Sequence, residues 1–209
     1  MLVLSHRGYW SKPEERNTTT AFTRSFDRGF GIETDFRDFN NVLVVSHDPP
    51  GSEALPAEKL FSLHLAAGRS LPIAMNVKAD GLQTLIREII DRHQVQDYFV
   101  FDMSVPDALG YVRSGLPVFT RQSEYEPSPA YYSSAAGVWM DMFHSEWITP
   151  DDISRHLDTG KRVCIVSPEL HRREHRRFWD ALSGDSICLH PSLMICTDLP
   201  EDAREMFCG

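Results

Sequence analysis

The chain has few cysteines, and none of them forms a closely spaced pair. Only four occur among 209 residues, and all of them lie in the last quarter of the sequence. The lack of a Cys-x-x-Cys pair disfavours a zinc site, and the low count disfavours a small scaffold held by disulfides. Cys164 and Cys196 lie within apolar runs, so we expect the cysteines to be free residues of the hydrophobic core.

Long apolar runs and an excess of basic residues are also missing. No run approaches the roughly 20 apolar residues of a membrane span, and the His6–Arg7 pair follows Met1 too early for an export segment. We therefore expect a cytoplasmic protein with no transmembrane segment. The 30 acidic residues outnumber the 21 basic ones, which disfavours a nucleic-acid partner because phosphate neutralisation needs clustered Lys and Arg. A small phosphate substrate stays open, since a bound cation can reverse the local field.

The sequence does contain a repeated alternation of short apolar runs and helical stretches. Its 42% hydrophobic and 24% charged residues are typical of a globular domain, and we interpret residues 1–209 as a single one. Short apolar runs bounded by turn residues are typical of strands buried on both faces. The eight predicted strands are Leu2–Leu4, Gly31–Phe36, Pro72–Val77, Tyr98–Phe101, Pro117–Thr120, Val138–Met140, Arg162–Val166 and Leu193–Cys196.

Helical spacing of apolar residues marks the segments between these strands. It is clearest in Thr18–Arg28 and Leu82–Arg92, where the apolar side chains fall near one face. Asp80 is placed to cap the second of these helices, and Pro150–Asp151 to begin a later one.

Eight strands alternating with helices predict an α/β fold, a compact (β/α)8 TIM barrel with short loops. The length is near the lower limit of about 200 residues for this fold, so we expect some helices to be reduced or missing. Val42–Ser46 reads as a hairpin continuation of the second strand, turning at Asn40–Asn41. The alternative, an open doubly wound sheet, lacks a glycine-rich dinucleotide loop after Leu2–Leu4.

Polar residues lie where nearly every predicted strand ends. Catalytic groups of a barrel lie at the C-terminal ends of its strands, so these side chains are expected to surround one mouth. Glu33 and Asp35 are two residues apart on one strand, which directs both carboxylates to the same side. The strand-end residues are His6, Arg7, Glu33, Asp35, His47, Asn76, Lys78, Asp102, Arg121, Asp141, Glu169 and Asp198.

These residue types suit phosphoryl chemistry. Two carboxylates converging from one strand repel each other unless a cation lies between them, and hard oxygen ligands suit Mg²⁺ or Ca²⁺. Two histidines from different segments can supply a base and an acid. Arg7 and Lys78 can bind a substrate phosphate, the first bidentately and the second as a point charge. We place Arg121, Asp102, Asp141 and Glu169 around the mouth as further candidates.

Several blocks of the sequence resemble the glycerophosphodiester phosphodiesterase family, which shares its barrel with phosphatidylinositol-specific phospholipase C. The first two blocks are specific in this order, and the matches extend over the whole chain. The blocks are Ser5-His6-Arg7-Gly8 with Pro13–Thr18 and Ala21-Phe22, Glu33-Thr34-Asp35 with Ser46-His47-Asp48, Ile73–Lys78, and Cys196–Pro200.

The resemblance implies His6 and His47 as general acid and base, and Glu33 and Asp35 as metal ligands. The family's third ligand is usually acidic, and Asn76 occupies that position here, so we expect weaker metal binding. The implied activity is metal-dependent hydrolysis of a small, glycerophosphodiester-like substrate, with Mg²⁺ as the expected ion and Ca²⁺ as the alternative. Two other readings stay open: a phospholipase C- or D-like lyase that forms a cyclic phosphate, and a non-catalytic barrel that binds a phosphate or headgroup.

Two interpretations are open for each of several other polar and aromatic residues. Asp141 and Glu169 suit either the site or a structural role, and Trp139 and Trp147 suit the core better than a substrate platform. The basic run His171–Arg177 is typical of a solvated helix start, with contact to an anionic headgroup as the alternative.

Overall fold

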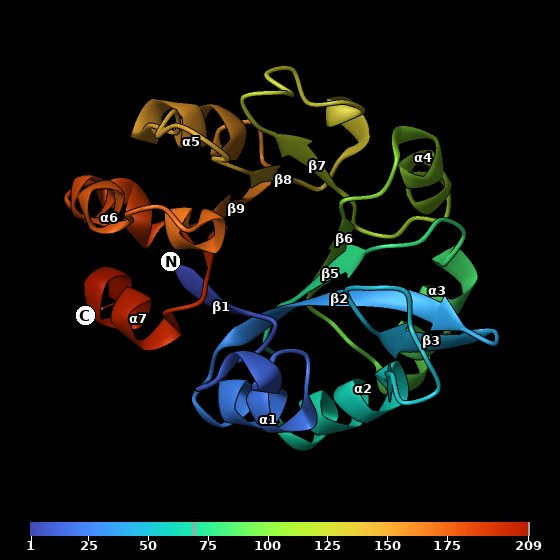
Figure 1. Cartoon of the computed structure of the whole chain (residues 1–209). Coiled ribbons are helices and arrows are strands. Elements are labelled where there is room, and N and C mark those ends of the chain that lie inside the picture. Colours follow the sequence, from blue (N-terminus) through green and yellow to red (C-terminus); the bar gives the residue numbers. More distant parts are fainter. Residues whose placement is uncertain (69, 209) are drawn as a thin grey trace.

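Eight parallel strands form a closed barrel in the computed structural model, which describes residues 1–68 and 70–208 (Figure 1). Neighbouring strands pair in parallel around the ring, and a bridge between Val100 and Val118 joins β6 to β7 and closes it. The strands are β1 Leu2–His6, β2 Gly31–Phe39, β5 Ile73–Val77, β6 Tyr98–Phe101, β7 Phe119–Gln122, β8 Gly137–Met140, β9 Arg162–Val166 and β10 Leu193–Thr197. The predicted (β/α)8 barrel is thereby confirmed.

The second strand continues beyond the ring into an antiparallel hairpin. β3 (Val42–Val45) pairs with the end of β2, and the two-residue β4 (Leu55–Pro56) pairs with β3. Asn40 and Asn41 have φ angles of 51° and 62°, the left-handed pair that a tight hairpin turn requires. The predicted hairpin and its turn are confirmed.

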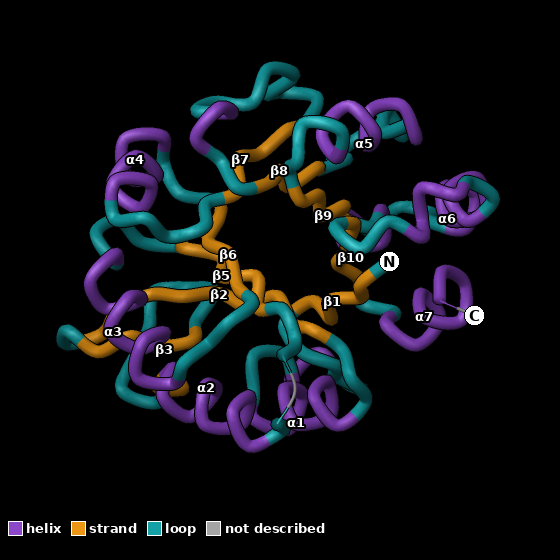
Figure 2. Tube along the Cα trace, turned by 180° about the vertical axis from the view of Figure 1, so that it is seen from behind, coloured by secondary structure: helices purple, strands orange, loops and turns teal. Residues whose placement is uncertain are grey.

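The helices cover the outside of the barrel (Figure 2). Between β7 and β8, the described chain has only the short 3₁₀ turn Tyr132–Ser134, so one crossover helix is reduced as expected. None of the described helices is long and apolar enough to cross a membrane. The helices are α1 Thr19–Asp27, α2 Ala57–Ala66, α3 Gln83–His93, α4 Val105–Arg113, α5 Pro150–Leu157, α6 Arg176–Ser183 and α7 Pro200–Cys208.

Of the two helix starts predicted from the sequence, one is confirmed and the other is wrong. Pro150 begins α5 behind a Thr149 cap, as predicted. The predicted cap Asp80 is wrong, because the α3 N-cap is Leu82, which has no side-chain cap bond. Gly81, at φ 84°, turns the chain between the two, and Asp80 instead accepts a hydrogen bond from the Ser104 hydroxyl at 3.3 Å.

Aromatic rings fill the barrel interior below the mouth. Phe99 and Phe119 stack with centroids 3.7 Å apart, and Phe101 stacks on Trp139 at 4.0 Å. Burying a ring of this size contributes roughly 2–3 kcal/mol. This packing makes the barrel a solid support for the residues at its rim. Trp139 therefore belongs to the core, as expected.

The four cysteines are free, as expected, but they are not all core residues. Three are buried and Cys208 is exposed. Cys208 lies at the end of the last helix, where the side chain can face outward. The expectation of a core position is wrong for this residue.

Candidate active site

A cavity of about 250 Å³ opens at the C-terminal ends of the strands, and we call it the cup. It brings together polar side chains from strands that are far apart in the sequence. The predicted site residues that line it are His6, Arg7, Glu33, Asn76, Lys78, Asp102, Arg121 and Asp141. Asp35 lies directly behind this lining, fully buried, whereas His47 and Glu169 do not line the cup.

The turn after β1 presents His6 and Arg7 to the cup. Arg7 has φ 57° and Gly8 φ 82°, and the Arg7 N–H donates to the Glu33 carbonyl at 2.8 Å. A Cβ on Gly8 would lie 2.8 Å from the Ala21 Cβ, so only glycine fits beside α1. The His-Arg-Gly order therefore has a backbone reason.

His6 is held in one orientation by an aspartate from the opposite end of the chain. Its Nδ1 lies 2.7 Å from Asp198 Oδ1. Because a carboxylate accepts, Nδ1 carries the proton, and Nε2 points toward Glu33 Oε2 at 3.9 Å. The His6 side chain is 18% exposed, so this imidazole is clamped yet reachable from the cup.

Three buried oxygens beside His6 lack a hydrogen-bond donor: Glu33 Oε2, Asp35 Oδ1 and Asn76 Oδ1. The Asn76 amide donates to the other Glu33 oxygen at 3.1 Å. Burial, and next the nearby Asp35 carboxylate, raise the pKa of Glu33. Unpaired buried oxygens are costly unless a cation takes their lone pairs, so this donor set fits a hard divalent ion.

The third member of that set is an amide. Accordingly, the described residues contain no group of three His, Cys, Asp or Glu side chains placed to hold a metal. An amide oxygen coordinates hard cations without contributing charge. The two carboxylates give this oxygen set a formal charge of about −2 at most.

Cations surround Asp35. Arg7 Nε lies 3.1 Å from Asp35 Oδ2, and Lys78 Nζ lies 3.7 Å from Oδ1. Asn17, at φ 59°, donates its amide to Oδ2 at 3.0 Å and accepts from the Thr34 hydroxyl. Asn17 is not among the predicted site residues, although it lies in the Pro13–Thr18 block that resembles the family.

A second ion-pair group continues around the rim. Asp102 contacts Lys78 Nζ at 3.1 Å and Arg121 Nη1 at 2.6 Å. Arg121 also pairs with Glu126. The cup therefore has cationic groups in both halves of the ring: Arg7 and Lys78 lie beside Asp35, whereas Arg121 lies on β7, next to the strand that leads to Asp141.

His47 lies apart from the cup, in an open cavity of about 720 Å³ that we call the hairpin cavity. Its side chain is 47% exposed, and its Nδ1 contacts Asp48 at 2.9 Å. Arg7 lines both cavities. The structure thus places the two predicted histidines on either side of Arg7 and does not bring them into one pocket.

The remaining mouth candidates differ in position. Glu169 accepts from the Ser167 and Thr197 hydroxyls and from the Asp198 N–H at 3.2 Å. It therefore supports the loop that carries Asp198 and does not face the cup. Asp141 does face it and contacts His171 Nε2 at 2.5 Å.

The sequence analysis did not predict His171 as a mouth residue apart from its basic run, and it did not predict Phe101 or Phe143 at the site. The basic run His171–Arg177 divides in the structure, because His171 ends a 3₁₀ turn at the cup whereas α6 begins at Arg176. Phe101, Phe143 and Trp139 also line the cup. Aromatic residues in a chain of this composition give no signal that distinguishes core from rim.

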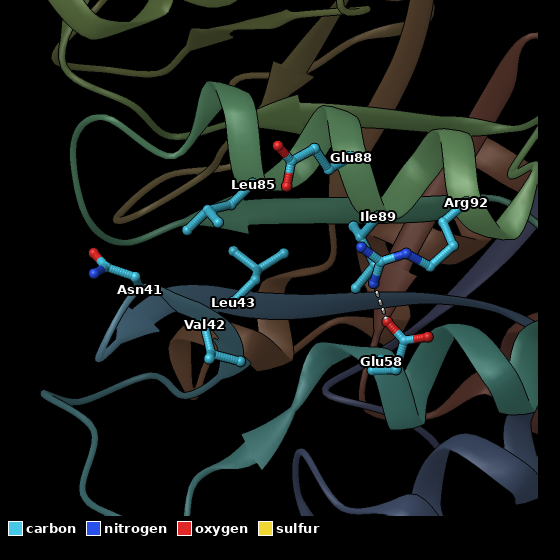
Figure 3. Close-up of a pocket in the computed structure, with 8 residues that line it drawn as sticks. All are labelled: Asn41, Val42, Leu43, Glu58, Leu85, Glu88, Ile89 and Arg92. Carbon is cyan, nitrogen blue, oxygen red and sulfur yellow. Dashed lines mark hydrogen bonds and ion pairs between the residues drawn. The ribbon is translucent and has the colours of Figure 1, made fainter.

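A third hollow lies on the outside of the barrel, between the hairpin and α3 (Figure 3). Its charged residues are partly engaged with each other, since Arg92 pairs with Glu58 at 2.8 Å. The imidazole N–H of His93 donates to the same carboxylate, and these bonds lower the pKa of Glu58. This groove contains none of the predicted site residues.

Comparisons with known proteins find solved structures with a similar fold. No family model matches the sequence, and no curated protein matches it. A glycerophosphodiester phosphodiesterase from Agrobacterium tumefaciens is 14% identical over 100% of both chains, with a TM-score of 0.71. A phosphodiesterase from Oleispira antarctica, solved with its product sn-glycerol-3-phosphate, is 13% identical over 100% of this chain and 97% of that chain, with a TM-score of 0.70.

The fold is also similar, at a lower TM-score, to that of one phospholipase. A Ca²⁺-dependent phosphatidylinositol-specific phospholipase C from Streptomyces antibioticus is 12% identical over 97% of this chain and 95% of that chain, with a TM-score of 0.58. At these identities, the likeness concerns the fold. The chain has the barrel fold that glycerophosphodiester phosphodiesterases and this phospholipase share.

Proposed function

We propose that the protein is a metal-dependent phosphoric diester hydrolase that acts on a small, glycerophosphodiester-like substrate. One observation carries the proposal: the Asp198-clamped His6 lies in a cup lined with cations, next to a set of three buried oxygens that accept no hydrogen bond. Acid–base and electrostatic groups are what phosphoryl transfer requires, because its transition state is mainly stabilised by charge. The fold likeness to phosphodiesterases supports it.

The oxygen set would hold the cation. Glu33, Asp35 and Asn76 are its proposed ligands, with Mg²⁺ as the expected ion and Ca²⁺ as the alternative. When bound, such an ion neutralises developing charge on the phosphoryl oxygens. Arg7 and Lys78 bind the same phosphate from the rim.

In this proposal the two histidines carry out the proton transfers of the reaction, one as general acid and the other as general base. His6 gives or takes a proton at Nε2, because Asp198 occupies its Nδ1 side. His47 is the proposed partner, acting from the hairpin cavity across Arg7. A cytoplasmic location belongs to the same proposal, and it rests on the sequence.

Two alternatives follow from particular observations. The likeness to a phospholipase C favours a lyase that releases a cyclic phosphate. The neutral Asn76 at the third ligand position favours a barrel that binds a phosphate without turnover, because the site has one negative charge fewer.

A panel of phosphodiesters assayed with Mg²⁺, Ca²⁺ or Mn²⁺, and with EDTA, tests the proposal. We expect turnover with one of these ions and a loss of activity in EDTA that the ion restores. Full activity in chelator contradicts the metal role. Phosphorus NMR separates a monoester product from a cyclic phosphate. An Asn76→Glu variant that gains activity over a silent wild type identifies the non-catalytic alternative.

A further inference from the structure

A second carboxylate-held imidazole faces the cup from the wall opposite the oxygen set. Asp141 Oδ1 accepts from His171 Nε2 at 2.5 Å, in the same manner as Asp198 holds His6 by the other ring nitrogen. The side chains of Asp141 and His171 are 9% and 23% exposed. Within residues 1–68 and 70–208, no group hydrogen-bonds to His171 Nδ1. In the neutral ring this nitrogen is an acceptor, and it is the free polar atom of the pair.

The strand order sets this pair opposite the oxygen set and Lys78. Around the ring, β8 lies four strands from β2, and β9 lies four strands from β5. Glu33 and Asp35 belong to β2, whereas Asn76 and Lys78 end β5. A phosphate bound at that wall therefore has Asp141 and His171 across the cup, within the same cavity, where one of its substituents can reach them.

The backbone beneath the pair is fixed. The Trp147 indole donates to the Asp141 carbonyl at 2.9 Å, and Arg173 donates to the Met142 carbonyl at 2.9 Å. The Phe143 ring packs on the His171 imidazole with centroids 4.9 Å apart. These contacts hold the imidazole in place before a ligand binds, which reduces the entropy cost of binding.

We propose that His171 contacts the alcohol group of the substrate and selects an alcohol that carries a free hydroxyl, which donates to Nδ1. Asp141 is the positioning residue that keeps Nε2 protonated and Nδ1 available. This inference rests on the proposed function and adds to it the residue that selects the alcohol. A quaternary ammonium alcohol, held by Phe101, Phe143 and Trp139, is the competing ligand because aromatic faces attract such cations.

The probes are three monoesters: glycerol phosphate, n-propyl phosphate and choline phosphate, each measured by calorimetry and by inhibition of hydrolysis. We expect wild-type protein to bind glycerol phosphate about 10-fold more tightly than n-propyl phosphate, the value of one good hydrogen bond. His171→Phe keeps ring volume and removes the acceptor, so the preference should vanish. His171→Asn returns an amide oxygen near the Nδ1 position and should recover part of it.

Control variants separate this role from a structural one. Asp141→Asn should reduce the hydroxyl preference while the unfolding temperature stays close to that of the wild type. For a hydroxylated diester, His171→Phe should raise KM and leave kcat within about threefold, because the contact is made equally in ground and transition states. The matched control is His190→Phe, since His190 lies before β10 and outside the cup, and among the described residues its side chain hydrogen-bonds only to the Ser192 N–H.

The outcomes are distinguishable. A His171→Phe protein that is folded and still prefers glycerol phosphate overturns the inference, as does a wild type that prefers choline phosphate. A wild type that neither hydrolyses any diester nor binds any of the phosphates refutes the proposed function itself.

Discussion

His6 and His47 occupy two contrasting regions of the molecule. His6 ends a barrel strand, is 18% exposed and is clamped by Asp198. His47 follows the hairpin strand β3 outside the ring, is 47% exposed and contacts only the highly exposed Asp48 by its side chain in the described structure. The His47 carbonyl accepts from Arg37 at 3.0 Å, and the Ser46 N–H donates to the Asp35 carbonyl at 3.0 Å. The hairpin therefore fixes the His47 backbone and leaves its ring free.

The difference shows how a barrel separates positioning from access. A side chain at a ring strand is fixed by neighbours on both sides, whereas one on a hairpin extension has neighbours on one side only. We therefore expect His6 to be ready before substrate binds, and His47 to be ordered by the substrate.

The largest effect is expected from His6→Ala, a loss in kcat of about 1,000-fold, because a held acid–base group contributes roughly 10²–10⁴. Steady-state rates with saturating metal measure it. Circular dichroism and bound-metal content serve as the control for folding. Near wild-type turnover in a folded, metal-bound variant would remove His6 from the mechanism.

Gly8→Ala should lower the free energy of unfolding by about 3 kcal/mol, since it combines a left-handed backbone with a clash against Ala21. Urea denaturation measures the change. Gly160→Ala is the matched control, because Gly160 also has positive φ, at 78°, but nothing lies within 4 Å of its added Cβ. An equal loss in the two variants would mean that the clash beside His6 contributes nothing.

His47→Ala should reduce kcat by about 100-fold, less than His6→Ala, because substrate must first order this ring. The comparison uses the same diester and metal for both variants. If the two losses are equal, exposure in the free protein does not predict function. If His47→Ala keeps wild-type rates, the second acid–base group lies elsewhere.

Replacing Asp198, the partner of His6, should lower kcat more than replacing Asp48, the partner of His47. Asp198→Asn should cost about 10- to 100-fold in kcat and shift the pH–rate profile, because Asp198 sets the His6 tautomer. Asp48→Asn should stay within about threefold, since an exposed pair contributes little. Matching pH profiles for wild type and Asp198→Asn would assign Asp198 a purely structural part.

Much of the fold was predictable because local patterns and the barrel agree. Tyr98–Phe101 and Arg162–Val166 have the predicted bounds, since both are short apolar runs between turn residues. β7 begins at Phe119, two residues later than the predicted Pro117. The Pro117 carbonyl instead accepts from the Val100 N–H at the barrel closure, a non-local contact that the pattern does not contain.

The candidate site was also predictable only in part. Residue types and order alone predicted that His6, Arg7, Glu33 and Asp35 lie together, because strand ends of a barrel meet at one mouth; the structure places His6 beside Glu33 and Asp35 beside Asn76 in register. The sequence could not show that Glu169 does not line the cup, since its carboxylate is engaged by the Ser167 and Thr197 hydroxyls and the Asp198 N–H, which are brought together only by the packing of two strand ends.

The sequence by itself determined the barrel and the oxygen and cation types at its mouth, which follow from periodicity and from the chemistry of single side chains. The neutral Asn76 at the third proposed ligand position follows from the resemblance of the Ile73–Lys78 block to the family. Only the tertiary structure decided that Asp198 clamps His6, that His47 lies in a separate cavity and that Asp141 and His171 form the opposite wall. The first and the last depend on closing the ring, which brings residues as far apart as His6 and Asp198 within one hydrogen bond; the position of His47 depends on how the hairpin lies outside that ring.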